Sequence, residues 1–181
     1  MNLFTTPRIV DAFTFAAQAH GDQKRKYTGT PYIFHPYEVA CIVSTVIPGD
    51  EDIIIAALLH DVPEDTEVSL QQVEDRFGKF VGRMVFDLTD CTKDMGNRKT
   101  RKALDRERLR FAVPASKTIK LADFLSNTGT IVEHDPDFAV VYLREKEETL
   151  PALLGGHEDL YLQVRLTLEK SKRILENMKN E

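Results

Sequence analysis

The chain has 181 residues, enough for one domain with a substantial core, and its apolar fraction of 42% is ordinary for a globular protein. A formal net charge of −5 argues against general nucleic-acid binding, which needs a basic face, but permits a local basic pocket for a small anion. The apolar runs are too short to span a bilayer, the N-terminus has no basic leader, and Cys41 and Cys91 lack metal-binding spacing. We therefore expect a cytoplasmic protein with reduced thiols that binds neither membranes nor nucleic acid.

Helices are expected along most of the chain, because runs of β-branched residues are few. Capping residues, apolar periodicity and stops at Gly or Pro predict helices over about 7–20, 35–46, 50–61, 69–78, 81–89, 101–112, 114–131, 138–154 and 157–180. The segments 21–32 and 90–100 are rich in turn residues and read as loops. The charged helix before Ala112 should pack through Leu104, Leu109 and Phe111. With no repeat or dividing linker, the sequence predicts an all-α, single-domain helical bundle over residues 1–181.

The stretch AALLHDVPEDT, residues 56–66, ends an apolar run with four titratable side chains. Pro63 should stop the helix just past His60 and Asp61. A charge buried alone is costly, and a divalent ion accepts neutral imidazole together with carboxylate. The end of this helix is therefore a candidate metal site.

Two more ligands must come from elsewhere in the chain. His35 opens a helix after the apolar PYIF, and Asp123 stands inside the apolar stripe of TIKLADFLSN. Together with His60 and Asp61 they form a two-histidine, two-carboxylate set that leaves coordination positions for water and a substrate oxygen.

Each of these residues also has a structural interpretation. His35 before Pro36 can be a cap, and Asp123 can pair with Lys120 or Arg101. Glu64 and Asp65 can be solvated acids that favour the start of the next helix. Taken singly, the structural interpretation is favoured for each residue; the joint order H…HD…D favours the metal site.

These segments resemble a known family, the HD phosphohydrolases, and within it the hydrolase domain of the RelA/SpoT alarmone enzymes of the stringent response and their small Mesh1-like relatives. The similar segments run from about residue 10 to 130, namely AAQAHGDQKRKYTGTPYIFHPYEVA, AALLHDVPEDT, FGKFV and TIKLADFLSNT. The resemblance implies an HD-type helical fold, with C-terminal helices over about 137–180 beyond the motifs. It also implies Mn²⁺ and hydrolysis of the 3′-pyrophosphate of (p)ppGpp to GDP or GTP.

The resemblance implies roles for individual residues. The implied metal ligands are His35, His60, Asp61 and Asp123. Glu64 and Asp65 match an acidic pair that positions or deprotonates water, and Asn127 matches an asparagine near metal and substrate. Arg25 and Lys26 match a basic pair that packs on the guanine and its phosphates. Lys24, and in a second basic run Arg98, Lys99, Arg101 and Lys102, can also balance phosphate charge, although that run can equally be a solvated helix start.

The sequence departs from the family where members often read KLADRLHNMRT. Phe124, Ser126 and Gly129 replace an arginine, a histidine and another arginine, which puts substrate preference in doubt. The alternatives are another HD phosphohydrolase activity, such as a nucleotidase or NADPH phosphatase, and a non-catalytic nucleotide-binding module. The order of preference among ppGpp, pppGpp and pGpp, the metal and the oligomeric state stay open.

Overall fold

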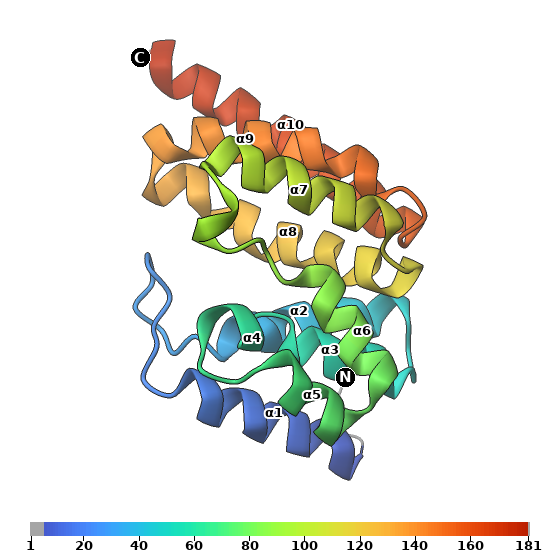
Figure 1. Ribbon diagram of the computed structural model, residues 1–181. Helices are drawn as coiled ribbons and strands as arrows, with labels where there is room; N and C mark the ends of the chain where they lie inside the picture. Colours follow the sequence, from blue (N-terminus) through green and yellow to red (C-terminus); the bar gives the residue numbers. More distant parts are fainter. Residues whose placement is uncertain (1–5, 181) are drawn as a thin grey trace.

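The computed structural model describes residues 6–180 and is helical apart from its loops and one isolated antiparallel bridge between Lys24 and Pro31 (Figure 1). This confirms the predicted all-α bundle. The elements in chain order are α1 (Pro7–His20), α2 (Phe34–Val46), α3 (Glu51–Leu59), α4 (Val62–Asp65), α5 (Leu70–Phe77), α6 (Lys79–Leu88), the 3₁₀ helix η1 (Lys93–Met95), α7 (Arg98–Phe111), α8 (Pro114–His134), α9 (Pro136–Thr149), the 3₁₀ helix η2 (Leu150–Leu153) and α10 (Glu158–Asn180).

Local sequence signals set the helix starts. The Thr6 hydroxyl accepts a hydrogen bond from the Ile9 amide at the start of α1, and Ser69 forms a capping box with Gln72 at the start of α5. Asp135 caps α9 by accepting from the Phe138 amide. Each cap satisfies an amide that the helix itself leaves unpaired.

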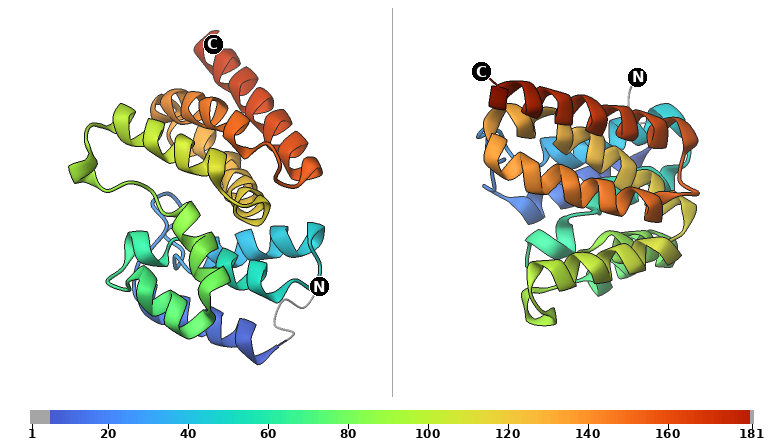
Figure 2. Two further views of the ribbon diagram at one scale, coloured as in Figure 1. Left: turned by 45° about the vertical axis from the view of Figure 1, so that its right-hand side comes forward. Right: turned by 90° about the horizontal axis from the view of Figure 1, so that it is seen from above.

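Helix α8 is the central element of the bundle. It packs against α2, α3 and α6 on one side and against α9 and α10 on the other (Figure 2). A helix covered on both sides can present inward-facing polar groups to the interior. The candidate residues on α8 therefore lie between two halves of the molecule, one formed by α2, α3 and α6 and the other by α9 and α10.

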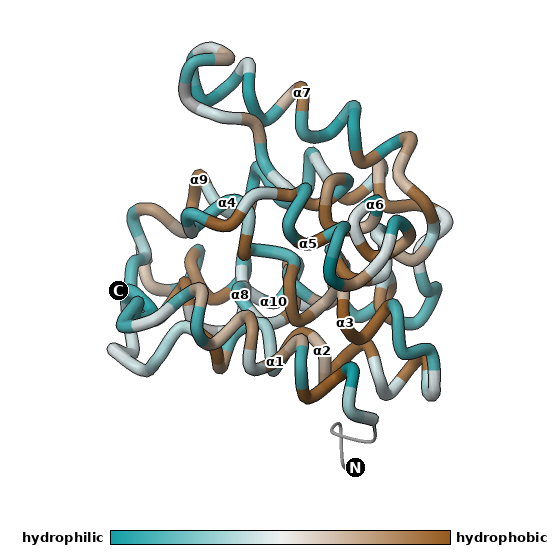
Figure 3. The backbone as a smooth tube through the Cα atoms, turned by 60° about the horizontal axis from the view of Figure 1, so that its bottom comes forward, coloured by the Kyte–Doolittle hydropathy of each residue, from teal (hydrophilic) through white to brown (hydrophobic). Residues whose placement is uncertain are grey.

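Helix α3 is the most apolar element, and it lies in the core. All seven residues from Ile53 to Leu59 are buried, and α3 is largely brown in the hydropathy view, whereas α7 is largely teal (Figure 3). Burial on all sides explains why α3 shows no amphipathic periodicity.

Two sequence-based expectations need correction. The segment 90–100 is not a loop throughout, because η1 lies within it and α7 already begins at Arg98, where the Asn97 side chain caps the helix. Only Leu109 of the three apolar residues expected to anchor α7 is buried; Leu104 and Phe111 are exposed. The many charged side chains of this helix obscured both its start and its inner face.

Two other properties concern membranes and the state of the two cysteines. Among residues 6–180, none of the helices combines the length and the apolar character that crossing a bilayer requires. Cys41 and Cys91 are free thiols, as expected.

Candidate metal centre and active site

His60 stands at the point where α3 ends. Pro63 lacks an amide hydrogen, and its ring is incompatible with continuing the helix, so the chain leaves α3 after Leu59 and starts α4 at Val62. The predicted stop is therefore confirmed, with Pro63 in the first turn of the new helix. His60 Nδ1 is 2.7 Å from the Ala57 carbonyl oxygen, to which it donates. Its Nε2 is consequently unprotonated in the neutral ring and available as a ligand.

Three buried residues from separate elements meet at one point. His35 opens α2, His60 follows α3 and Asp123 lies in the middle of α8, and one ligand atom of each lies within 4.8 Å of the others. His35 Nε2 is 3.3 Å from Asp123 Oδ1. The structure thus brings together residues that are up to 88 positions apart in the chain.

Asp61 adds a second carboxylate to this cluster. Its Oδ2 lies 3.2 Å from His60 Nε2 and 3.5 Å from His35 Nε2. The Tyr32 hydroxyl donates a 2.7 Å hydrogen bond to the same oxygen and fixes the carboxylate in place. All four predicted metal ligands therefore converge.

The donor set fits a divalent transition-metal ion. Two ligands bonded to one ion at about 2.0–2.2 Å are about 3.0–3.4 Å apart, close to the observed spacings. His60 Nε2 is buried and makes no hydrogen bond to any described residue, and burial lowers the pKa of His60, which favours the neutral ring that metals bind. A buried imidazole nitrogen that makes no hydrogen bond and lies 3.2 Å from a carboxylate oxygen is an arrangement that a metal ion completes.

Glu64 and Asp65 line a solvent-open cavity of about 600 Å³ beside this cluster. Glu64 Oε2 accepts a 3.0 Å hydrogen bond from the Asp90 amide. The cavity walls exclude part of the water around Glu64, and together with the Asp90 carboxylate they raise its pKa to about 7. Burial likewise raises the pKa of Asp65, with a further contribution from Asp61.

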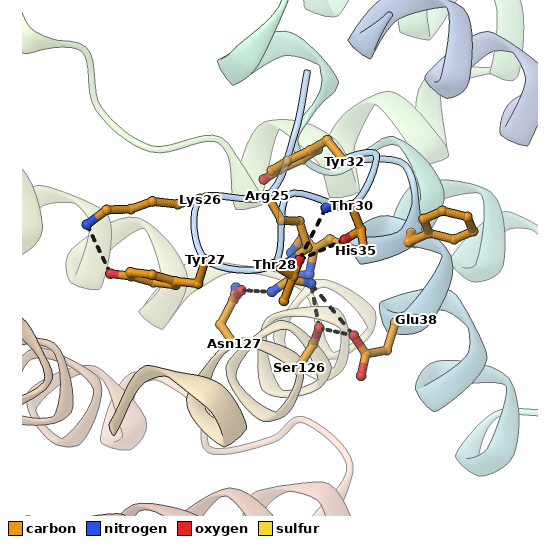
Figure 4. Close-up of a pocket in the computed structure, with 11 residues that line it drawn as sticks. Arg25, Lys26, Tyr27, Thr28, Thr30, Tyr32, His35, Glu38, Ser126 and Asn127 are labelled. Atoms are coloured by element: carbon orange, nitrogen blue, oxygen red, sulfur yellow. Dashed lines mark hydrogen bonds and ion pairs between the residues drawn. The ribbon is translucent and has the colours of Figure 1, made fainter. Parts of the chain in front are cut away.

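A second cavity, of about 390 Å³, is lined by His35 and by residues of the loop between α1 and α2 (Figure 4). The loop between α1 and α2 folds back on itself, with the Arg25 amide donating to the Thr30 carbonyl at 2.9 Å. This turn directs Arg25 to α8, where its guanidinium donates to Asn127 Oδ1 at 3.0 Å. Asn127 Nδ2 in turn donates to Asp123 Oδ1 at 2.6 Å, which connects the basic loop to the metal cluster.

The structure does not bring every predicted phosphate-binding residue to a cavity. Arg25 and Lys26 line the second cavity, although Lys26 also pairs with Asp135, while Lys24 is exposed and lines neither cavity. Arg101 and Lys102 line the cavity of Glu64 together with Arg98. Lys102 forms an ion pair with Asp90 and Arg98 pairs with Glu145, whereas Arg101 has no carboxylate partner among the described residues.

Residues 12–148 match the family model of the HD domain. The chain belongs to the HD-domain family.

Relatives of this HD-domain chain carry more specific names. Human MESH1, a guanosine-3′,5′-bis(diphosphate) 3′-pyrophosphohydrolase, is 43% identical over 138 residues, which cover 72% of this chain and 73% of MESH1. A protein of the same activity from Aquifex aeolicus is 39% identical, but the match covers only 18% of its length. A solved structure described as a metazoan ortholog of SpoT that hydrolyses ppGpp superposes with a TM-score of 0.83 at 30% identity, covering 91% of this chain and 96% of that chain. The resemblance to Mesh1-like proteins is confirmed.

Two lysines that sequence analysis did not assign to the site balance the negative charge of the HD cluster, which consists of His35, His60, Asp61 and Asp123. Lys120 Nζ lies 3.2 Å from Asp123 Oδ2, so the predicted structural ion pair coexists with the metal cluster on the other carboxylate oxygen. Burial alone would lower the pKa of Lys120, but Asp123 and Asp90 outweigh it and raise that pKa. Lys146 stands over the Phe124 ring, 3.9 Å from its centroid, and burial lowers its pKa to about 8.

Sequence reasoning also missed residues that hold the HD-site ligands. Tyr32 holds Asp61 through the hydrogen bond that its hydroxyl donates. Ser126 was noted only as a departure from the family, yet its hydroxyl lies 3.0 Å from His35 Nδ1. The local sequence does not predict these contacts, because each partner is distant in the chain.

Proposed function

We propose that this HD-domain protein is a metal-dependent hydrolase that removes the 3′-pyrophosphate of (p)ppGpp, giving GDP or GTP and pyrophosphate. One observation carries the proposal: the two imidazoles and two carboxylates of the HD motif converge beside Glu64 in a chain 43% identical to human MESH1. The motif indicates metal-dependent hydrolysis, and the similarity to MESH1 indicates the class of substrate.

The residues proposed to hold the metal are His35, His60, Asp61 and Asp123. When bound there, a divalent ion would polarise a phosphoryl oxygen and lower the pKa of a water molecule at the site, to about 7 in zinc enzymes. Mn²⁺ is the proposed ion because the resembling family uses it; imidazole and carboxylate also suit iron, cobalt and zinc.

The proton from the attacking water passes to a carboxylate of the chain. We assign this role to Glu64, because a general base is most effective when its pKa is near the working pH, and its pKa is about 7. Asp65 supports the water from the same cavity. Asn127 holds Asp123 and Arg25 in place through the two ends of its amide.

Phosphate charge is balanced by the basic residues of both cavities. Arg25 and Lys26 line the cavity that includes His35, and Arg101 and Lys102 line the cavity that includes Glu64. A nucleotide with diphosphates at both ends requires cations on both sides of the scissile bond. Lys24 is exposed, so its proposed contribution is limited to long-range attraction of the substrate.

A panel of substrates tests the proposal directly. Purified protein reconstituted with Mn²⁺ should release pyrophosphate from ppGpp, pppGpp or pGpp, and release phosphate from NADPH and deoxynucleotides far more slowly. Preferential turnover of NADPH or a deoxynucleotide would instead support another HD phosphohydrolase. Binding of ppGpp without any turnover would support a non-catalytic module.

The Asp61→Ala variant links this activity to the proposed site. Removing the carboxylate should abolish Mn²⁺ binding and turnover, because both imidazoles lose their shared neighbour. Asp75→Ala, on the exposed surface of α5, is the matched control and should behave as wild type. Wild-type activity in Asp61→Ala would exclude the site. The cytoplasmic location of the reaction remains our prediction from the sequence.

A further inference from the structure

The two histidines of the HD cluster are held in different ways. His60 Nδ1 donates to a backbone carbonyl, which can only accept, so the protonation of its ring is fixed by the main chain. His35 Nδ1 faces instead the Ser126 hydroxyl at 3.0 Å. A hydroxyl can donate or accept, so Ser126 alone does not decide which nitrogen of His35 carries the proton.

A third residue removes this ambiguity. The Ser126 hydroxyl donates a 2.7 Å hydrogen bond to Glu38 Oε2, one turn after His35 on α2 (Figure 4). A serine hydroxyl has one hydrogen, and because it points to the carboxylate it cannot also point to His35. Ser126 must therefore accept from His35 Nδ1–H, which in the neutral ring leaves Nε2 unprotonated on the side of Asp61 and Asp123.

Arg25 lies beside the Glu38 carboxylate at the outer end of this chain of hydrogen bonds. Its Nη1 is 3.7 Å from Glu38 Oε2, while its Nη2 donates to Asn127. The Glu38 side chain is 53% exposed, whereas Ser126 and His35 are buried, so the three residues connect the surface to the interior. Ser126 contacts the His35 imidazole, Glu38 contacts Ser126, and Arg25 lies beside Glu38.

We propose that Ser126 and Glu38 are positioning residues, which together hold His35 with Nε2 unprotonated and directed at the metal site. The inference rests on the proposed metal site and adds its outer layer. Outer contacts of this kind typically change metal affinity by about 10- to 100-fold. Ser126, one of the departures from the family motif, thereby acquires a defined role.

Metal affinity is the decisive readout, because it does not depend on any substrate. Titration calorimetry with Mn²⁺ should show about tenfold weaker binding for Ser126→Ala than for wild type. Ser126→Thr, which keeps the hydroxyl, should restore most of the affinity. Ser44→Ala is the matched control, since Ser44 is a buried serine on α2 whose hydroxyl donates to the Cys41 carbonyl.

A double-mutant cycle separates a linked chain of contacts from two independent effects. Glu38→Ala, a surface change that should not affect folding, is expected to weaken Mn²⁺ binding severalfold, and to have no further effect in Ser126→Ala. Equal Mn²⁺ affinity in Ser126→Ala and wild type, or additive effects of the two changes, would overturn the proposal.

This test is distinct from that of the proposed function. A wild-type protein that binds Mn²⁺ but releases no pyrophosphate would refute the alarmone hydrolase, while the affinities of the variants would still decide the role of Ser126 and Glu38.

Discussion

At the scale of single residues, Glu64 is the side chain to which we assign the most specific chemical role, that of the general base. Its raised pKa, about 7, comes from the walls of its cavity and the neighbouring Asp90. Only the deprotonated carboxylate can take a proton from water. We therefore expect kcat/KM, measured at saturating Mn²⁺, to fall as the pH drops through about 7.

Glu64→Gln should remove this acidic limb and slow hydrolysis by about 100-fold or more, because the variant keeps the shape of the side chain and loses the base. Mn²⁺ affinity should be unchanged, since Glu64 lies outside the proposed ligand set. A pH–rate profile of both proteins checks this. An unchanged rate in Glu64→Gln would remove the residue from the mechanism.

The sequence allowed all four proposed ligands to be predicted, because the family motif names them and their apolar flanks are visible. Their outer partners could not be predicted. Tyr32 lies 29 positions from Asp61, and Ser126 lies 91 positions from His35. Such contacts depend on how α2, α3 and α8 cross, which local patterns do not encode.

At the scale of elements, the caps and breakers predicted most helix boundaries. Ser69, Asp135 and Pro63 act as their types suggest. The start of α7 was missed because its cap, Asn97, is followed by a basic run that resembles a solvated loop. The charged residues gave no clear helical pattern at the start of α7. The packing of α7 in the fold leaves Leu104 and Phe111 exposed.

The contact between α5 and α6 gives a prediction at this scale. Gly82 is buried in α6, and a Cβ there would lie 2.9 Å from Glu74 Cβ on α5. Gly82→Ala should therefore destabilise the protein by about 1–3 kcal/mol, because α5 must move away. Gly129→Ala is the control in α8, where an added Cβ meets nothing within 4 Å.

The control should stabilise the protein by up to about 1 kcal/mol, since alanine favours a helix over glycine. Denaturant unfolding of both variants measures these changes. Equal stability of Gly82→Ala and Gly129→Ala would show that the two helices do not approach as described.

At the scale of the whole molecule, the proposed metal site joins parts of the bundle that are distant in sequence. His35 belongs to α2, His60 follows α3 and Asp123 belongs to α8, which packs on both halves. An ion that binds only the folded chain stabilises it by about 2.7 kcal/mol at 100 times its Kd. For a chain of this length that corresponds to a rise in Tm of roughly 5–10 °C.

Thermal unfolding with and without Mn²⁺ tests this prediction. Ca²⁺ is the control ion and should have a smaller effect, because it prefers oxygen ligands to imidazole. The rise should disappear in Asp61→Ala. No shift of Tm with any divalent transition-metal ion would contradict a metal site that connects the helices.

The position of the bound ion shows whether these four side chains form the metal site. A crystal structure of the protein with Mn²⁺, with anomalous data collected near the manganese edge, should show one strong peak bound by His35 Nε2, His60 Nε2, Asp61 and Asp123. A peak elsewhere, or no peak in a preparation that hydrolyses ppGpp, would contradict the claim that these four side chains form the catalytic centre.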